Sequence, residues 1–176
     1  MLTRPDLRES HRTSVLDRSL DEVWDVVASG WAGRQWYVDA LPFVFRGAVD
    51  RVVGGPGRRW QPPGTPLLRH GDLAGFWRVT RAEHDGPRRL LLLEAQVRAP
   101  GTVRLLTTAQ AVEEAVDGAV ENAAGPPEAH GRTRLVQTVE LEPHGLLGTA
   151  YLLADIPARE AVVELTHRRL LADLRA

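Results

Sequence analysis

The sequence predicts an α+β fold in which an antiparallel sheet is combined with one long C-terminal helix. Three observations predict it: helical periodicity before residue 54, short apolar segments joined by Gly- and Pro-containing turns over residues 75–112, and a helical pattern over residues 146–174. At 176 residues, the chain suits one domain over 1–176 that buries a core without disulfides or metals.

The N-terminal part predicts one strand followed by two shorter helices. Residues 11–17 alternate weakly in polarity, and Ser19 can cap a helix that ends near Gly30. Residues 42–53 carry apolar side chains at helical spacing and predict the second helix. The segment GGPGRRW (54–60) follows that helix, whereas a phosphate-binding loop precedes one. Its glycines therefore predict a helix cap, although Arg58 and Arg59 could still meet an anion.

The central part predicts an antiparallel meander. Asp85–Gly86–Pro87 and Pro100–Gly101 are short enough to make hairpin turns, and residues 113–131 are rich in Ala, Gly, Glu and Pro, which indicates a mobile loop. A helix that is kinked or interrupted at Pro157 ends the chain. The expected strands are residues 75–84, 88–97, 102–112 and 132–143, and the final helix is Leu146–Leu174.

Composition excludes several classes of function. The formal net charge of −1 gives no field that would attract nucleic acid. Every basic residue is Arg, so no lysine is present for a Schiff base or a P-loop. Cysteine is absent and the six histidines have no metal-ligand spacing, so we expect no metal and no cofactor. No apolar stretch is free enough of charge to span a membrane, and we expect a cytoplasmic protein.

The order of strand, two helices, antiparallel meander and long terminal helix resembles the START-like, polyketide cyclase-type (SRPBCC) superfamily. Within it, GGPG after the second helix, GD before FWRV, LLLEAQVRAPG and QT…HGLLG resemble an uncharacterised subfamily often appended to NAD(P)-binding reductase or epimerase domains. The resemblance implies a helix-grip fold, with a curved sheet wrapped around the C-terminal helix and a cavity for a small apolar molecule. It implies no particular reaction.

Two features depart from the proteins that this chain resembles. No GxGxxG follows a predicted strand, so the chain has no Rossmann half. Arg159 stands where the resemblance implies a histidine after the helix proline, which argues against transferring an acid–base role to that position.

Hairpin parity predicts which side chains line the cavity, because cross-strand neighbours share a face. Turns at Asp85–Gly86 and Pro100–Gly101 place Trp77 and Glu94 on one face and Arg78 on the other. Two arginines near mid-strand are easier to solvate than one glutamate beside Trp, so the Trp77 face is predicted to be the inner one. The predicted ligand-binding residues are Trp77, Val79, Leu92, Glu94, Gln96, Leu105, Thr107 and, on the final helix, Tyr151.

Glu94 is the one candidate for acid–base catalysis on that face, where burial would raise the pKa of its carboxyl. It could equally anchor a ligand, or pair with an arginine. His70 and Asp72 could supply a base and its orienting carboxylate, but Asp72 before a strand is more typical of a turn.

Three functional hypotheses follow. The first is binding of a small apolar or amphipathic molecule between sheet and terminal helix, in the service of an NAD(P)-dependent partner enzyme. The second is an aromatase/cyclase-like enzyme that acts on a polyketide-like substrate. The third is an interaction domain whose interior is filled by its own side chains. The sequence does not decide whether the protein is an enzyme, and it leaves open the ligand and the oligomeric state.

Overall fold

The computed structural model describes residues 9–31, 35–44, 51, 63–97, 101–112 and 131–176, with residues 145–156 described by their backbone. Five of the strands follow one another without an intervening helix, and the helices lie before and after them in the sequence. They are β1 (Glu9–Leu16), α1 (Leu20–Val27), α2 (Trp36–Asp39), β2 (Leu73–Ala74), β3 (Trp77–Glu83), β4 (Arg88–Ala95), β5 (Gly101–Val112), β6 (Arg132–Pro143) and α4 (Gly145–Asp173).

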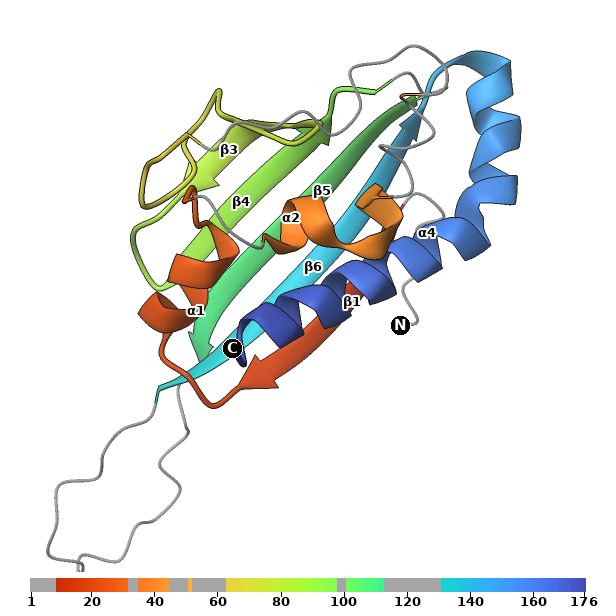
Figure 1. The fold of residues 1–176 in the computed structure, drawn as a ribbon. Helices are drawn as coiled ribbons and strands as arrows, with labels where there is room; N and C mark the ends of the chain where they lie inside the picture. The colour runs from red at the N-terminus through yellow and green to blue at the C-terminus, as the bar shows by residue number, and fades with distance from the viewer. Residues whose placement is uncertain (1–8, 32–34, 45–50, 52–62, 98–100, 113–130) are drawn as a thin grey trace, which may run out of the picture.

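The six strands form one antiparallel, curved, open sheet with the order β1-β6-β5-β4-β3-β2 (Figure 1). Strands β2 to β6 are a meander, and β1 pairs with the far side of β6. Helices α1, α2 and α4 cover the same face of the sheet, with α1 on β5 and β6, and α4 on β6 and β1. This arrangement confirms the predicted α+β class and is compatible with a helix-grip fold.

Helix α1 begins where the sequence predicts it. The Ser19 hydroxyl accepts from the backbone N–H of Glu22, and the Glu22 carboxylate accepts from the backbone N–H of Ser19, which makes a capping box. Its apolar positions Val23, Trp24 and Val27 are buried against the sheet. The capping prediction is confirmed.

The structure describes only part of the region after α1, so the helix predicted there can be compared with it only in part. Residues 41–44 and residue 51 are helical, and the rest of the predicted helix over 42–53 lies outside the described residues, as does the GGPGRRW segment at 54–60. The predicted loop over 113–131 also falls there, except for Gly131. The short helix α2 precedes this region and was not predicted, since four residues are too few to show periodicity.

Three aromatic side chains tie α1, α2 and the sheet together through main-chain carbonyls. The indole of Trp36 donates to Val27 O at 3.1 Å, and that of Trp77 donates to Tyr37 O at 2.9 Å. The phenol of Tyr37 donates to Ser29 O. All three rings are buried, and burial raises the pKa of Tyr37, so the phenol keeps the proton that it donates.

A β-bulge in β3 sets which face each residue occupies. Near the turn, Arg81 is opposite Leu92, the parity that the sequence predicts, but Thr80 is an extra residue and beyond it Val79 is opposite Leu93. On the other side of β4, Leu93 is opposite Leu105, a register that a two-residue turn at Pro100–Gly101 does not give. The predicted face of β4 is therefore wrong relative to both of its neighbours.

Helix α4 is long, and Pro157 lies in its interior. Proline lacks the N–H of the helical ladder and crowds the preceding turn, which kinks helices. Figure 1 shows α4 changing direction along its length, with its C-terminal half lying across β6 and β1. None of the helices described combines the length and the apolar character needed to cross a bilayer.

The bulge generates a prediction about deletions. Removing Thr80 should leave the fold intact, because Val79 and Arg81 then become neighbours and every side chain keeps its face. The loss should be about 2 kcal/mol, since two hydrogen bonds disappear, one from Thr80 Oγ1 to Leu92 O at 3.2 Å and one from His70 Nδ1 to Thr80 O at 2.9 Å. Urea unfolding followed by tryptophan fluorescence measures this.

The matched control is deletion of Leu106, which lies in a strand segment without a bulge. That deletion moves half of β5 to the opposite face, so we expect no cooperative unfolding transition. Equal damage from the two deletions would contradict the role of Thr80 as the extra residue.

Candidate functional site

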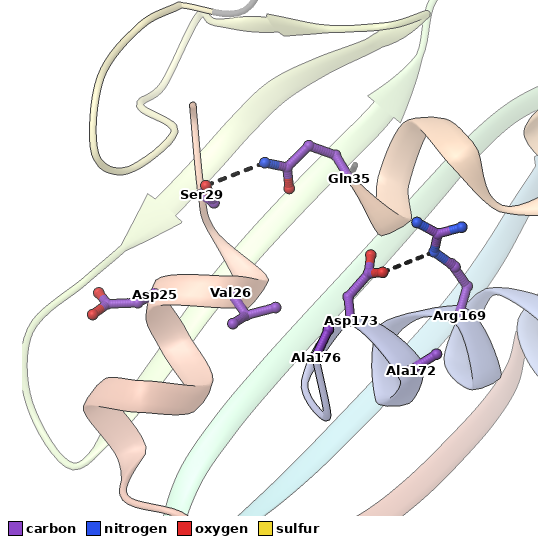
Figure 2. A pocket seen from close by; sticks show the side chains of 8 residues that line it. All are labelled: Asp25, Val26, Ser29, Gln35, Arg169, Ala172, Asp173 and Ala176. Atoms are coloured by element: carbon purple, nitrogen blue, oxygen red, sulfur yellow. Dashed lines mark hydrogen bonds and ion pairs between the residues drawn. The ribbon is translucent and has the colours of Figure 1, made fainter. Parts of the chain in front are cut away.

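A pocket of about 430 Å³ lies between α1 and the C-terminal end of α4 (Figure 2). Its walls come from the two helices, from Ser29 and Ala176 just beyond their C-terminal ends, and from the residue that precedes α2. None of the lining residues belongs to the sheet. Apolar and polar side chains share the lining, which consists of Asp25, Val26, Ser29, Gln35, Arg169, Ala172, Asp173 and Ala176.

The first wall is held in place by hydrogen bonds between α1 and α2. The amide nitrogen of Gln35 donates to Ser29 Oγ at 3.2 Å and to Trp31 O at 3.1 Å. The backbone N–H of Gln35 donates to the Asp39 carboxylate at 3.0 Å. Both donor groups of Gln35 are therefore used inside the protein, and its carbonyl oxygen remains as an acceptor.

The second wall is an ion pair at the end of α4. Arg169 and Asp173 are one turn apart, and the Arg169 Nε–H donates to Asp173 Oδ1 at 2.9 Å. Their side chains are 26% and 16% exposed. The other carboxylate oxygen, Asp173 Oδ2, is buried and has no hydrogen-bond donor.

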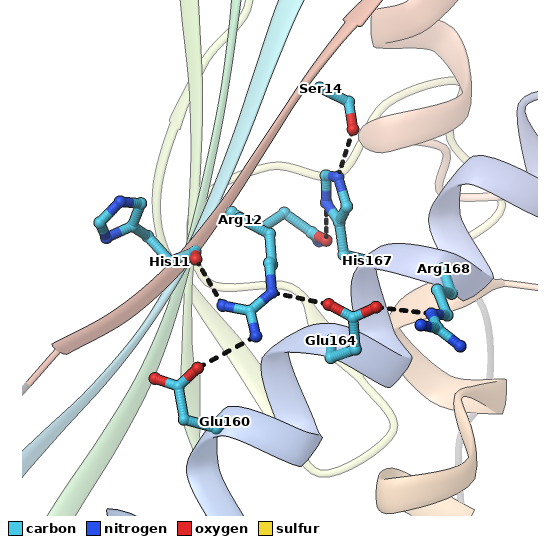
Figure 3. A network of polar contacts seen from close by, with 8 residues as sticks. His11, Arg12, Ser14, Glu160, Glu164, His167 and Arg168 are labelled. Atoms are coloured by element: carbon cyan, nitrogen blue, oxygen red, sulfur yellow. Dashed lines mark hydrogen bonds and ion pairs between the residues drawn. The ribbon is translucent and has the colours of Figure 1, made fainter.

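A second cluster of polar side chains lies between α4 and the inner face of the sheet (Figure 3). Ser14 Oγ lies 2.8 Å from His167 Nε2, and His167 Nδ1 lies 3.0 Å from Gln137 Oε1. The Gln137 amide nitrogen in turn lies 3.3 Å from Thr107 Oγ1. The four residues make one continuous chain from β1 through α4 to β6 and β5.

The direction of these hydrogen bonds follows from the chemistry of the partners. Because the Gln137 nitrogen donates to Thr107, its oxygen accepts, so His167 Nδ1 carries a proton. Burial lowers the pKa of His167 from its ordinary value of 6.5, which favours the neutral ring. Its Nε2 is then an acceptor, and the Ser14 hydroxyl donates to it.

Ion pairs fasten the outer side of α4 to β1. Arg12 contacts Glu160 at 3.0 Å and Glu164 at 2.6 Å (Figure 3). A hydrogen bond from Ser10, and then Arg12, lower the pKa of Glu160, and Arg12 followed by Arg168 lower that of Glu164. These groups are partly exposed, so each pair contributes little to the free energy of folding.

No group of three His, Asp or Glu side chains within the described ranges is arranged to hold a metal ion. The hydroxyl, imidazole and amide groups of Figure 3 are satisfied by one another, and the carboxylates beside them are satisfied by arginines. This part of the molecule offers two features: a hydroxyl that donates to a neutral imidazole, and a pocket lined by both hydrogen-bond donors and acceptors.

Part of the predicted ligand-binding set does share the inner face. Trp77, Val79, Leu105 and Thr107 are all buried beneath the helices, at 2% exposure or less. They do not line the pocket of Figure 2. Except for Thr107, which bonds to Gln137, they pack in the apolar core.

The remaining strand residues of that set face elsewhere. Leu92 and Glu94 alternate with the buried Leu91 and Leu93, so they lie on the uncovered face, and Gln96 follows the strand in an exposed position. Their predicted place beside Trp77 is wrong, because the bulge at Thr80 changes the register. Their role in ligand binding stays a prediction.

Glu94 has arginine neighbours on the uncovered face. Arg104 contacts its carboxylate at 3.3 Å, and Arg78 is its cross-strand partner on β3. The pairing with arginine that the sequence left open is thus observed, in a partly exposed setting.

Two helix residues complete the comparison with the sequence. Tyr151 belongs to α4, and its side chain lies outside the described residues. Arg159 is 3% exposed, and its Nε–H donates to Ser10 Oγ at 3.1 Å. Arg159 therefore has a structural partner on β1.

Sequence reasoning missed Ser14, His167, Arg169 and Asp173. The spacing of Arg169 and Asp173 is a recognisable i,i+4 pair, but on a helix surface that spacing is common and indicates no site. The Ser14–His167 pair joins residues 153 positions apart, and no local pattern reveals it.

The buried imidazole generates a prediction about pH. Between the ordinary pKa of 6.5 and the lower folded value, the unfolded chain binds a proton on His167 that the folded protein does not bind. Stability should therefore be undiminished above about pH 7 and should fall as the pH decreases through the ordinary pKa of histidine toward the lower pKa of His167 in the folded protein. The lowered pKa values of Glu160 and Glu164 place their loss at more acidic pH.

His167→Gln should flatten this slope in urea unfolding measured across the same pH range. The control is His11→Gln, which removes an exposed histidine from the same region and should keep the wild-type slope. An unchanged slope in His167→Gln would show that another group causes the dependence.

Comparison with known proteins gives a family without an assigned activity. No curated protein sequence matches the chain. The crystal structure of TTHA0849 from Thermus thermophilus is 15% identical, covering 94% of this chain and 96% of that one, with a TM-score of 0.33. The solution structure of the 18 kDa protein CC1736 from Caulobacter crescentus is 14% identical, covering 96% and 99%, with a TM-score of 0.31. Likeness at this level supports no functional assignment. The family model described as "Protein of unknown function (DUF2867)" matches residues 1–166, and the chain belongs to that family.

Proposed function

We propose that the protein is a binding module that holds a small amphipathic molecule in the pocket between α1 and α4. The observation that carries the proposal is the pocket itself, whose volume of about 430 Å³ lies in the range of about 300–1,000 Å³ that is usual for ligand sites. Its mixture of Val26 and Ala172 with Ser29, Gln35 and Asp173 suits a ligand with one polar and one apolar end.

This location differs from the cavity that a START-like fold implies. The resemblance places a ligand between the sheet and the terminal helix. In the described part of that interior, aromatic and aliphatic side chains pack on one another, as in the contacts of Phe43 with Phe76 and Trp77. We therefore place the ligand between α1 and α4, farther from the sheet than the cavity of a START-like fold. We retain the helix-grip superfamily as the proposed ancestry. Service to an NAD(P)-dependent enzyme rests on the resemblance alone.

A second candidate function is supported by the Ser14–His167 pair. A hydroxyl that donates to a neutral imidazole, whose other nitrogen is held by an acceptor, is the arrangement that activates serine nucleophiles. It suits the enzymatic alternative better than Glu94, which faces away from the helices. Ser14 is half-buried and His167 is 5% exposed, so a substrate would have little access to either residue. This limited access favours the binding module.

Native mass spectrometry of protein purified from the organism that encodes it tests the first candidate. We expect a small molecule to co-purify with the wild type and to be lost, by at least about tenfold, from Ala172→Trp, because the indole occupies the pocket. Ala161→Trp is the matched control, since Ala161 is an exposed alanine on the same helix that does not line the pocket. Empty wild-type spectra, or full retention by Ala172→Trp, would reject the proposal.

A fluorophosphonate probe separates the two candidates. A binding module should show no covalent adduct by intact-protein mass spectrometry, because an unactivated serine does not react. Labelling that disappears in both Ser14→Ala and His167→Gln would instead support the enzyme.

A further inference from the structure

We infer that the uncovered face of the sheet binds a second copy of this chain, in a dimer whose two sheets stack face to face. The uncovered face is the side of the sheet opposite α1, α2 and α4, and none of the described helices lies on it (Figure 1). The inference goes beyond the proposed function and does not depend on it. Three properties of the described strands carry it: an apolar centre, opposite charge at the two ends of the face, and an area that suits a dimer.

The centre of the uncovered face is apolar. Strand pairing places its side chains in two adjacent rows, and all four aliphatic members are partly exposed. An apolar patch bordered by charged groups is typical of a protein interface. A second sheet can cover it, since two sheets pack face to face about 10 Å apart with their side chains interdigitated. The Leu90 row consists of Leu90, Thr108 and Val136, and the Leu92 row consists of Leu92, Leu106 and Thr138.

The two ends of this face carry opposite charge. At the acidic end, beyond the Leu92 row, four glutamates outnumber two arginines. At the basic end, beyond the Leu90 row, the next row has two arginines and no carboxylate, and these arginines make none of the ion pairs within the described ranges. The acidic end consists of Glu9, Glu94, Glu140 and Glu142 with Arg78 and Arg104 among them, and the basic end consists of Arg88 and Arg134 with Gln110 between them.

These charges select one arrangement of the two copies. A two-fold axis that crosses the strands between the Leu90 and Leu92 rows places the acidic end of each copy opposite the basic end of the other. An axis parallel to the strands would instead place like charges opposite each other, which weakens association. Stacked sheets keep their strand directions within about 30° of each other, so the ends stay opposite in a twisted pair.

The uncovered face is also large enough for a dimer. Strands β3, β4, β5, β6 and β1 contribute to it, in four rows from the Glu94 row to the Arg88 row. With strands about 4.8 Å apart and rows about 6.8 Å apart, the projected area is about 650 Å². The relief of the side chains makes the accessible area larger than this projection. The face therefore approaches the area of about 800 Å² that each partner buries in a standard interface.

The arrangement leaves the proposed ligand site open. Helices α1 and α4 lie on the opposite face of the sheet, so the pocket of each copy points away from the second copy (Figure 1). Dimerisation and ligand binding are then separate properties of the chain.

Sedimentation velocity tests for the dimer. We expect the wild type at micromolar concentration to form a species of about twice 19.4 kDa. Leu106→Glu should weaken the dimer at least about tenfold, because it places an unpaired carboxylate in the apolar centre of both copies. Leu165→Glu is the matched control, since it makes the same change at a leucine of α4 that is 38% exposed and lies away from this face. It should dimerise like the wild type.

Charge reversals test the axis and keep the inference falsifiable if Leu106→Glu fails to fold. Arg134→Glu makes both ends of the face acidic on β6, and Glu140→Arg makes both ends basic there. Each variant alone should dimerise at least about tenfold more weakly than the wild type, because like charges then meet. An equimolar mixture of the two should recover dimers, because each acidic end meets a basic end. Circular dichroism establishes that each variant is folded.

Three outcomes would overturn the inference: a wild type that remains at 19.4 kDa throughout the micromolar range, a dimer that a folded Leu106→Glu leaves unchanged, or a mixture of the two charge variants that does not associate. Ala172→Trp, which fills the proposed pocket, should dimerise like the wild type. The proposed function and the dimer can therefore fail separately.

Discussion

The hydrogen bonds from Trp36, Tyr37 and Trp77 to main-chain carbonyls are the interactions on which the helical layer depends. Trp36 and Tyr37 satisfy the carbonyls of Val27 and Ser29, which the end of α1 leaves without helical partners. Trp77 joins the same α2 segment to the sheet. Because Ser29 and Gln35 lie within this framework, one wall of the pocket is fixed by aromatic residues that are not part of its lining.

The other wall depends on how α4 lies on β1 and β6. Under this helix the sheet carries Ser10, Ser14, Gln137 and Thr107, where a purely apolar interface would be the simpler solution. Each of these four sheet residues has a named partner, so these groups carry little of the penalty for burying polar atoms. A helix shifted by one turn would lose most of these partners, so the polar contacts specify one position for α4. That position brings Arg169 and Asp173 opposite α1.

The sequence predicted the elements better than their faces. The strand over 132–143 was predicted with its observed bounds, because its side chains alternate without interruption. The inner face of β4 was not, because Leu90 to Leu93 are all leucine and show no alternation, and one extra residue at Thr80 reverses the parity. The pocket could not be predicted from the sequence, for a different reason. It forms where two helices from opposite ends of the chain meet, and the residues that line it carry no shared motif.

The pairing of β1 with β6 also affects how the protein is made. The meander from β2 to β6 can assemble from neighbouring segments, but β1 has no partner until β6 exists, and Arg12 meets Glu164 across 152 residues of sequence. During synthesis from the N-terminus, β1 therefore remains unpaired until β6 has been translated. Late closure of this kind slows folding, since the loop must close before the contacts that stabilise it form. The side chains of β1 include polar and charged groups, among them Ser10, Arg12 and Ser14. They make the unpaired strand less prone to aggregate than an apolar strand would be.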